Sequence, residues 1–411
     1  MYKTLLAVIL LITAVAFVPA TAQQLSGGME LTLTHVGAEW NGGIKFKMGD
    51  QEAAQPVRDV KVNGNELSLT TTLMGTEFRF KGKLDQGKLG GDIEVFEKGT
   101  KVGAGTWTLS RQGDAPSATD FVGTWTGTFQ AAAIEQQQAD ASFDVSVAHP
   151  AYTNKHPRVL FDEAHNNFHT TTGRYKPFAT LVTNDGYEVT PNKQPFSAET
   201  LKGYDILVIS NALGPRGQRA SAAFTDAESD AVRDWVRAGG SLLFIADHAP
   251  MGGAAEILAR RFDVDMSKAY TLDKAHSDPA ANEPSQLLYT RENKLLADHP
   301  ITQGRGREER INRVITFTGQ SLKGPAGSVA FLKLADTAVD VMPSDKKEVP
   351  AQGRAQGLAM NFGKGRVVVL GEAAMMTAQV ANGTDRFGMN YPGTDDRQLA
   401  LNIMHWLSRL F

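Results

Sequence analysis

The feature that most constrains this chain is a pair of apolar runs separated by one strongly signalled helix. The runs are DILVISN at 205–211 and SLLFIAD at 241–247, and their apolar residues are consecutive rather than alternating. Strands of this kind are buried on both faces, as in a parallel sheet covered by helices on both sides. Between the runs, Thr225 and Glu228 form a capping box, and Gly239 marks the helix end.

The rest of the chain from residue 158 onward repeats this alternation of strands and helices. Further apolar runs at 159–161, 314–317 and 366–370 predict strands, and an amphipathic pattern at the C-terminal end predicts a last helix. Alternation of this kind is typical of a mostly parallel sheet with helices on both faces. We therefore expect residues 158–411 to form a flavodoxin-like, doubly wound α/β domain.

The preceding residues follow a different, two-residue period. In the segment 23–112, apolar and polar residues alternate, Asn63-Gly64 is a strong hairpin signal, and turn residues recur regularly. This spacing predicts a small antiparallel all-β accessory domain, either a sandwich or a barrel. Residues 113–157 are expected to be a linker, with an extra strand as one option near 121–125.

Residues 1–22 have the pattern of a signal peptide. Lys3 supplies the positive charge, an apolar run follows at 5–18, and the small residues before position 23 form a cleavage site. The run is shorter than the roughly 20 residues that a membrane span needs. We expect cleavage after Ala22 and export to the periplasm or beyond, with no stable membrane span in the mature chain; an uncleaved anchor is the alternative.

Composition excludes several classes of function. The formal net charge is -3, so bulk electrostatics gives no reason to expect a nucleic-acid partner or attachment to a membrane surface. The chain contains no cysteine. Disulfides, thiolate metal ligands and a cysteine nucleophile are therefore all excluded. Nothing in the sequence indicates the oligomeric state.

Polar side chains gather where several predicted strands end. The stretch RVLFDEAHNNFH at 158–169 begins as an apolar strand and continues into the densest group of ligand-type side chains in the chain. The carboxyl ends of parallel strands line one crevice, so such groups are expected to meet there. The candidate catalytic residues are Asp162, Glu163, His165, Asp247 and His248, and the candidate ligand-binding residues are Asn166, Asn167, Asn211, Glu372 and Asn390.

Some of these side chains are also candidate metal ligands. His165 and His169 are four positions apart, the spacing that places two imidazoles on one face of a helix. Together with Asp247 and His248 they suggest a divalent cation, such as zinc, manganese or calcium, with a metal-activated water. The alternative is that these residues cap and tether loops through hydrogen bonds.

Two familiar motifs are not supported by their surroundings. Residues 162–165 spell DEAH, but no phosphate-binding G-x-x-x-x-G-K-[ST] precedes them, which disfavours an ATP-driven function. The chain also lacks the G-x-S-x-G nucleophile elbow, so a serine hydrolase of the usual α/β kind is disfavoured.

Several segments of the second half resemble one superfamily. The run from YDILVISN through FTDAESDAVRDWVRAGG to SLLFIADH, at 204–248, is similar to the core of the class I glutamine amidotransferase-like superfamily, and within it to trehalose-utilisation (ThuA-like) and related uncharacterised bacterial domains. DHPITQG at 298–304 resembles that group's HPI-x-x-G segment, and GRVV at 365–368 its late strand. The amidotransferases carry a nucleophilic cysteine where this chain has Asp247-His248, so their thiol chemistry is not carried over.

Two functions are consistent with these patterns. The first is an exported hydrolase-like enzyme that acts on a small polar or carbohydrate-like ligand through the Asp/His/Glu cluster, with a metal-activated water as one route. The suggestion of a sugar rests on the family resemblance alone. The second is a non-catalytic periplasmic ligand-binding or scaffold protein that uses the same crevice for recognition.

Overall fold

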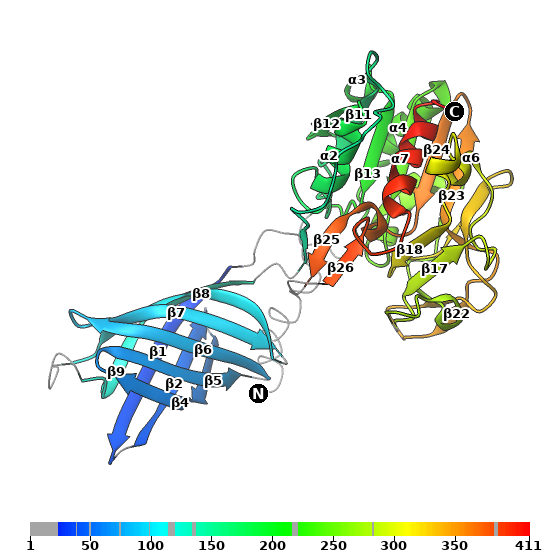
Figure 1. Ribbon diagram of the computed structural model, residues 1–411. Coiled ribbons are helices and arrows are strands. Elements are labelled where there is room, and N and C mark those ends of the chain that lie inside the picture. Colours follow the sequence, from blue (N-terminus) through cyan, green and yellow to red (C-terminus); the bar gives the residue numbers. More distant parts are fainter. Residues whose placement is uncertain are drawn as a thin grey trace. The chain divides into compact units, whose positions relative to one another are not determined.

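The computed structural model divides into two compact units, 1–136 and 137–411 (Figure 1). The predicted signal peptide at 1–22 lies outside the residues that the structure describes. Those residues are 24–37, 39–48, 51–73, 75–97, 99–113, 120–133, 137–215, 221–281, 283–381 and 385–411.

The first unit is a nine-stranded antiparallel sheet in the order β3-β2-β1-β9-β8-β7-β6-β5-β4. The edge strands β3 and β4 are neighbours in sequence, and the sheet curls so that β3 contacts β5 and β2 contacts β4. The Thr71 hydroxyl donates a hydrogen bond of 2.9 Å to the carbonyl of Pro56, across this junction. The strands are β1 (Gln24–Val36), β2 (Glu39–Met48), β3 (Gln51–Pro56), β4 (Arg58–Asn63), β5 (Glu66–Leu73), β6 (Thr76–Asp85), β7 (Lys88–Glu97), β8 (Thr100–Arg111) and β9 (Gly123–Ala133).

Large side chains fill the inside of this curled sheet. Trp107 and Trp125 are buried, and each indole N–H donates to a backbone carbonyl, that of Asp92 and that of Phe121 respectively. Gly82 makes room for the first ring, because a Cβ there would lie 2.5 Å from the Trp107 side chain. Strand β9 pairs with both β1 and β8, so the first unit continues well past residue 112 and the optional strand near 121–125 is an interior strand.

The second unit is built on a nine-stranded sheet in the order β12-β11-β13-β14-β24-β23-β19-β15, with β20 also paired to β23. Its strands are β11 (Arg158–Asp162), β12 (Glu188–Asn192), β13 (Ile206–Ser210), β14 (Ser241–Ile245), β15 (Asp265–Met266), β19 (Leu322–Lys323), β20 (Val329–Lys333), β23 (Ala355–Phe362) and β24 (Gly365–Leu370). The helices are α2 (Lys176–Asn184), α3 (Ala198–Leu201), α4 (Asp226–Ala238), α5 (Met251–Arg260), α6 (Pro300–Gln303) and α7 (Asp396–Leu407), with 3₁₀ turns η2 (Lys274–His276), η3 (Arg307–Glu309) and η4 (Ala374–Met376).

Three smaller sheets complete the second unit. They are β10 (Gln137–Ala139) with β25 (Ala378–Ala381) and β26 (Asp385–Gly388), β16 (Tyr270–Leu272) with β21 (Val339–Val341) and β22 (Glu348–Pro350), and β17 (Gln286–Thr290) with β18 (Arg313–Phe317). Among the described helices, none has the length and apolar character that crossing a membrane requires.

The predicted flavodoxin-like, mostly parallel fold is wrong for this chain, and so is the amidotransferase-like architecture that the resemblance implied. Across the described residues strand exceeds helix, and the first unit is wholly antiparallel. In the large sheet of the second unit, four strand pairings are parallel and four are antiparallel. The turn at Gly363-Lys364 explains part of the difference, because it joins β23 to β24 as a hairpin and so tight a turn forces antiparallel pairing.

The parallel part of this sheet, β12-β11-β13-β14-β24, contains the two apolar runs. Every residue of β13 and β14 is buried, because helices pack on both faces of the strands. Alternate strand residues belong to two cores, one that includes Phe178 of α2 and Ile403 of α7, and one that includes Val232 of α4 and Leu258 of α5. The carboxyl ends of these strands lie at one edge of the sheet, where the polar side chains follow them.

Candidate functional site

Two carboxyl groups lie at equivalent positions after the neighbouring parallel strands β14 and β24. The last residues of these strands, Ile245 and Leu370, are paired in register. Asp247 and Glu372 each come two residues later, so the pairing places them side by side at the edge of the sheet. Glu372 is fully buried, whereas 12% of the Asp247 side chain is exposed.

Backbone N–H groups surround both carboxyls. The two oxygens of Glu372 accept hydrogen bonds from the backbone N–H groups of Ala374 and Met375, at 2.5 and 2.8 Å. Asp247 Oδ1 accepts the N–H of His248 at 2.8 Å. Donors of this kind stabilise the ionised form of a carboxyl, so they offset part of the cost of burying it.

Burial nevertheless dominates the acidity of this pair. Burial raises the pKa of Asp247 to about 7, and burial together with the negative charge of Asp247 raises the pKa of Glu372 to about 8. Two carboxyls that share one enclosed site cannot easily ionise together, and the protons then belong to the pair rather than to either residue. The site therefore holds a proton close to neutral pH.

His248 and Tyr270 lie beside the outer carboxyl. The His248 ring stacks on the Tyr270 ring, with centroids 4.5 Å apart and planes inclined by 25°. Its Nδ1 lies 2.8 Å from the Ala249 carbonyl, which can only accept, so Nδ1 carries the proton and Nε2 is the basic nitrogen. Nε2 is 3.9 Å from Asp247 Oδ1, and burial lowers the pKa of His248. The ring is therefore neutral at physiological pH.

Two further residues position the pair. Asn211, directly after β13, has a positive φ of 48°, and its Oδ1 accepts the backbone N–H of Asp247 at 2.9 Å. The hydroxyl of Tyr175, a fully buried residue, donates to the carbonyl of Ala373 at 2.8 Å, immediately after Glu372. The sequence analysis selected Asn211 as a ligand-binding residue, but it did not select Tyr175 or Tyr270, because no local motif distinguishes them.

His165 makes a separate network with two other carboxylates. Its Nδ1 lies 2.9 Å from both oxygens of Asp162, and its Nε2 lies 2.9 Å from Oε1 of Glu228. Burial alone would lower the pKa of His165, but the hydrogen bonds and charges of these two carboxylates raise it. Because both ring nitrogens face acceptors, the ring is held as a buried imidazolium.

This network attaches the loop after β11 to the start of α4. Glu228 is the third residue of that helix and also completes the capping box with Thr225. His165 and Asp162 therefore have the tethering role that the sequence left open as an alternative, and both nitrogens of His165 are occupied. These contacts favour the tethering role, and the assignment of His165 and Asp162 as catalytic residues stays a prediction.

The remaining candidates of this loop are also tethers. Glu163 accepts the N–H of Thr171 at 2.7 Å and pairs with Lys193. Asn166 donates to the Gly214 carbonyl at 2.5 Å, and Asn167 donates to Asp162 Oδ2 at 3.0 Å. Asn390 lies in another part of the unit, where it donates to Asp140 and to the Gln379 carbonyl, each at 2.9 Å. None of these contacts joins the acid pair.

The predicted metal centre of His165, His169, Asp247 and His248 is not assembled. Within the described part of the chain, no group of three or more His, Asp or Glu side chains is placed to hold a metal ion. The four-residue spacing would align two imidazoles only on a helix, and residues 163–169 are irregular. His169 is instead enclosed against Tyr175, with ring centroids 4.6 Å apart, and its burial holds its pKa well below the usual value.

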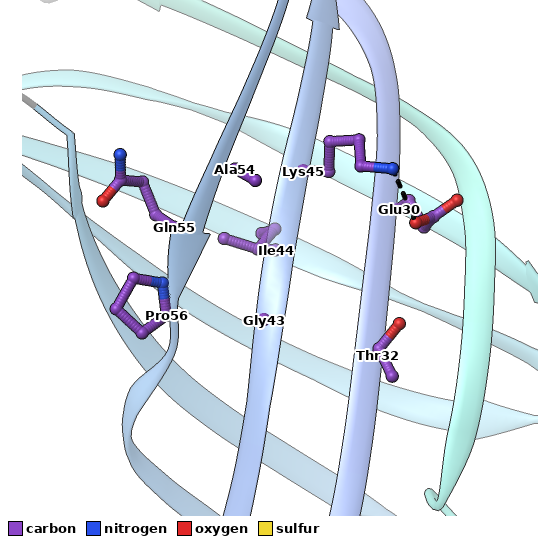
Figure 2. Close-up of a pocket in the computed structure, with 8 residues that line it drawn as sticks. All are labelled: Glu30, Thr32, Gly43, Ile44, Lys45, Ala54, Gln55 and Pro56. Carbon is purple, nitrogen blue, oxygen red and sulfur yellow. Dashed lines mark ion pairs between the residues drawn. The ribbon is translucent and has the colours of Figure 1, made fainter.

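A surface hollow on the first unit has a different character. Figure 2 shows this hollow, of about 380 Å³, over the outer face of β1, β2 and β3. Its charged residues, Glu30 and Lys45, form an ion pair of 3.2 Å and are both well exposed. An exposed ion pair of this kind contributes little energy, and the buried carboxyl pair lies in the second unit, so we place the candidate site there.

Comparison with known proteins does not assign a family. No family model matches the chain, and no curated protein matches it. One similar solved structure is the mmIFT52 N-terminal domain, which is 16% identical over 61% of this chain and 97% of that chain, with a TM-score of 0.43. Another is a cytoplasmic protein from Salmonella typhimurium LT2, which is 12% identical over 62% of this chain and 98% of that chain, with a TM-score of 0.34. An exo-β-1,4-mannosidase from Opitutaceae bacterium strain TAV5 is 12% identical over 53% of this chain and 31% of that chain, with a TM-score of 0.29. Similarities this low carry no functional argument.

The His165 network gives a prediction about stability. Replacing His165 with Gln leaves two buried carboxylates without their cation, so we expect the free energy of unfolding to fall by about 3 kcal/mol. Since the folded-state pKa of His165 is raised, its contribution is complete below about pH 6.5 and is lost as pH rises through that raised value. Urea unfolding from pH 5.5 to 9 measures this. His156→Gln, at an exposed histidine, is the control, and equal stability of the two variants would contradict the tether.

Replacing one residue of the acid pair is expected to stabilise the protein, whereas replacing His165 is expected to destabilise it. The pKa of Glu372 is raised on folding, so the folded protein binds more protons than the unfolded chain above about pH 4, and stability falls as pH rises towards 8. Glu372→Gln removes this penalty. We expect the variant to gain at least about 1 kcal/mol relative to the wild type between pH 5 and pH 9, measured by urea unfolding. A difference that does not change with pH would show that Glu372 does not take up a proton on folding.

Proposed function

We propose that the second unit is a hydrolase-like enzyme whose reactive groups are Asp247, Glu372 and His248. The supporting observation is the pair of adjacent buried carboxyls with pKa values raised to near neutrality. One carboxyl of such a pair is protonated and donates a proton while its ionised partner accepts one. General acid–base chemistry of this kind suits the hydrolysis of a bond whose leaving group needs a proton.

The exposures of the three groups suggest their separate roles. Asp247 and His248 keep 12% and 15% of their side chains exposed, whereas Glu372 is enclosed. Asp247 would contact the substrate, Glu372 would hold or release the shared proton, and neutral His248 would accept a proton from the attacking water through Nε2. The proposal relies on proton transfer because the described residues assemble no three-ligand metal group.

The substrate class that we propose is a small polar or carbohydrate-like molecule. The partly exposed Asp247 and His248 are hydrogen-bonding side chains, and Tyr270 adds a partly exposed aromatic ring beside His248. An aromatic body with a polar tip contacts both the apolar face and the hydroxyl groups of such a ligand.

One observation favours a second candidate function, a non-catalytic ligand-binding or scaffold protein. Both oxygens of Glu372 are bound by backbone donors, which is also how a structural carboxyl is held. In that case the two carboxyls would hold the segments after β14 and β24 without transferring protons. The two functions predict different hydrolysis rates when Asp247, the partly exposed acid, is replaced by asparagine.

Replacing Asp247 with Asn tests the enzyme. We expect hydrolysis of p-nitrophenyl glycosides or p-nitrophenyl acetate, used as probe substrates, to fall by about 10²–10⁴-fold because the amide cannot exchange a proton. In the wild type, the rate should peak where the pair holds one proton. Asp205→Asn is the matched control, since this exposed aspartate precedes β13 at the opposite edge of the sheet. Absence of hydrolysis in the wild type would favour the binding protein, and equal rates in the wild type and D247N would contradict the role of Asp247.

We also propose that the protein is exported. Support comes from the pattern of residues 1–22, in which a basic start, an apolar run and small residues occur in the order that signal peptidase reads. Mass spectrometry of the chain purified from a bacterial host that secretes it should give a mature N-terminus at Gln23. Ala20→Leu and Ala22→Leu together should block that cleavage. An intact Met1 on the wild-type protein would contradict the proposal.

A further inference from the structure

We propose that Gln320 is the positioning residue that holds the two acids together. It lies between β18 and β19 and is fully buried. Its side-chain Nε2 donates to the carbonyls of Ala246 and Asp247, at 2.8 and 3.0 Å. Its backbone N–H donates to the carbonyl of Gly371, immediately before Glu372, at 2.8 Å. A single residue therefore binds both chain segments that carry a carboxyl.

The same residue also binds the segment that carries Tyr270. The Oε1 of Gln320 accepts the backbone N–H of Lys268 at 2.8 Å. The backbone N–H of Thr271 donates to the carbonyl of Gly319, the residue before Gln320, also at 2.8 Å. Gln320 thus connects the acid pair to the aromatic ring that stacks on His248. Movement of any one of these segments would disturb the other two.

Close packing fixes this arrangement on two sides. A Cβ at Gly252 in α5 would lie 2.4 Å from the Gln320 amide nitrogen, and a Cβ at Gly371 would lie 2.2 Å from the Gln320 carbonyl oxygen. The chemistry of the contacts also selects an amide. Glutamate cannot donate to two carbonyls when ionised, and lysine has no acceptor for the Lys268 N–H.

The need for such a clamp follows from the charge of the pair. Two carboxyls in an enclosed site repel each other when both ionise, and this repulsion acts to separate the segments after β14 and β24. Gln320 adds hydrogen bonds to both segments beyond those that Asn211 and Tyr175 make. A fixed separation keeps the second proton hard to remove. The inference rests on the proposed function only for the chemical use of the pair, because the clamp itself is measured by titration.

The test is to titrate the carboxyl groups of the full chain carrying the substitution Gln320→Met. Methionine has a side chain of similar length but cannot make the amide hydrogen bonds. With ¹³C-labelled carboxyl groups followed by NMR, we expect the gap between the two titration steps of Asp247 and Glu372 to narrow by about half a pH unit or more. Gln379→Met is the control, because the buried amide of Gln379, in β25, donates to the Thr377 hydroxyl rather than to the carbonyls of Ala246 and Asp247. Unchanged steps in Q320M would overturn the inference.

Other ionisable groups facing the pair must be followed in the same spectra. They are His248, Tyr175, Tyr270, Tyr289 and Asp396, of which Asp396 is itself fully buried. If Q320M does not fold, Gln320→Asn keeps the amide on a shorter side chain, and a wild-type titration in Q320N would overturn the inference instead.

The clamp and the proposed function fail in different experiments. A narrowed gap in Q320M together with full activity of D247N would support the clamp and refute the enzyme. Loss of activity in D247N together with an unchanged titration in Q320M would support the enzyme and refute the clamp. If both proposals hold, Q320M should lose kcat by at least about tenfold with little change in KM, and its pH–rate profile should shift with the titration steps.

Discussion

Repulsion between two enclosed carboxyl groups is the constraint on which the arrangement of the second unit depends. Asp247 and Glu372 follow paired positions of neighbouring strands, so the register of β14 and β24 brings them together. Backbone donors from His248, Ala374 and Met375 offset part of the cost, and burial raises both pKa values despite them. A protein tolerates such a cost where the perturbed acids have a use, which makes this edge the strongest candidate for a functional site.

The same sheet contains a contrasting solution to the burial of charge. At the end of β11, His165 lies between Asp162 and Glu228, so a cation offsets two anions and each ring nitrogen has an acceptor. That network is satisfied and joins a loop to α4. The acid pair is instead contacted by backbone N–H groups and lies beside the neutral His248 ring, and one of its carboxyls is partly exposed. The difference between neutralised and unneutralised charge separates a structural tether from a candidate reactive site.

The sequence predicted much of this site and little of its geometry. Apolar runs located β13 and β14, and polar residues after strands pointed to Asp247, His248 and Glu372. The four-residue spacing of His165 and His169 wrongly predicted a shared metal site. Such spacing places two imidazoles on one face only in a helix, and this loop is irregular. The hairpin between β23 and β24 accounts for one of the four antiparallel pairings in the sheet that was predicted to be mostly parallel. Gln320 could not be found, since its partners are backbone groups distant in sequence.

The central claim is that Asp247 and Glu372 share one enclosed site, so that the charge of one sets the proton affinity of the other. The most direct measurement is the pKa of Glu372, followed by ¹³C NMR, in the wild type and in Asp247→Asn. Because the amide removes a neighbouring negative charge, we expect the pKa of Glu372 to fall in the variant. An unchanged pKa of Glu372 would contradict the claim and leave two independent buried acids.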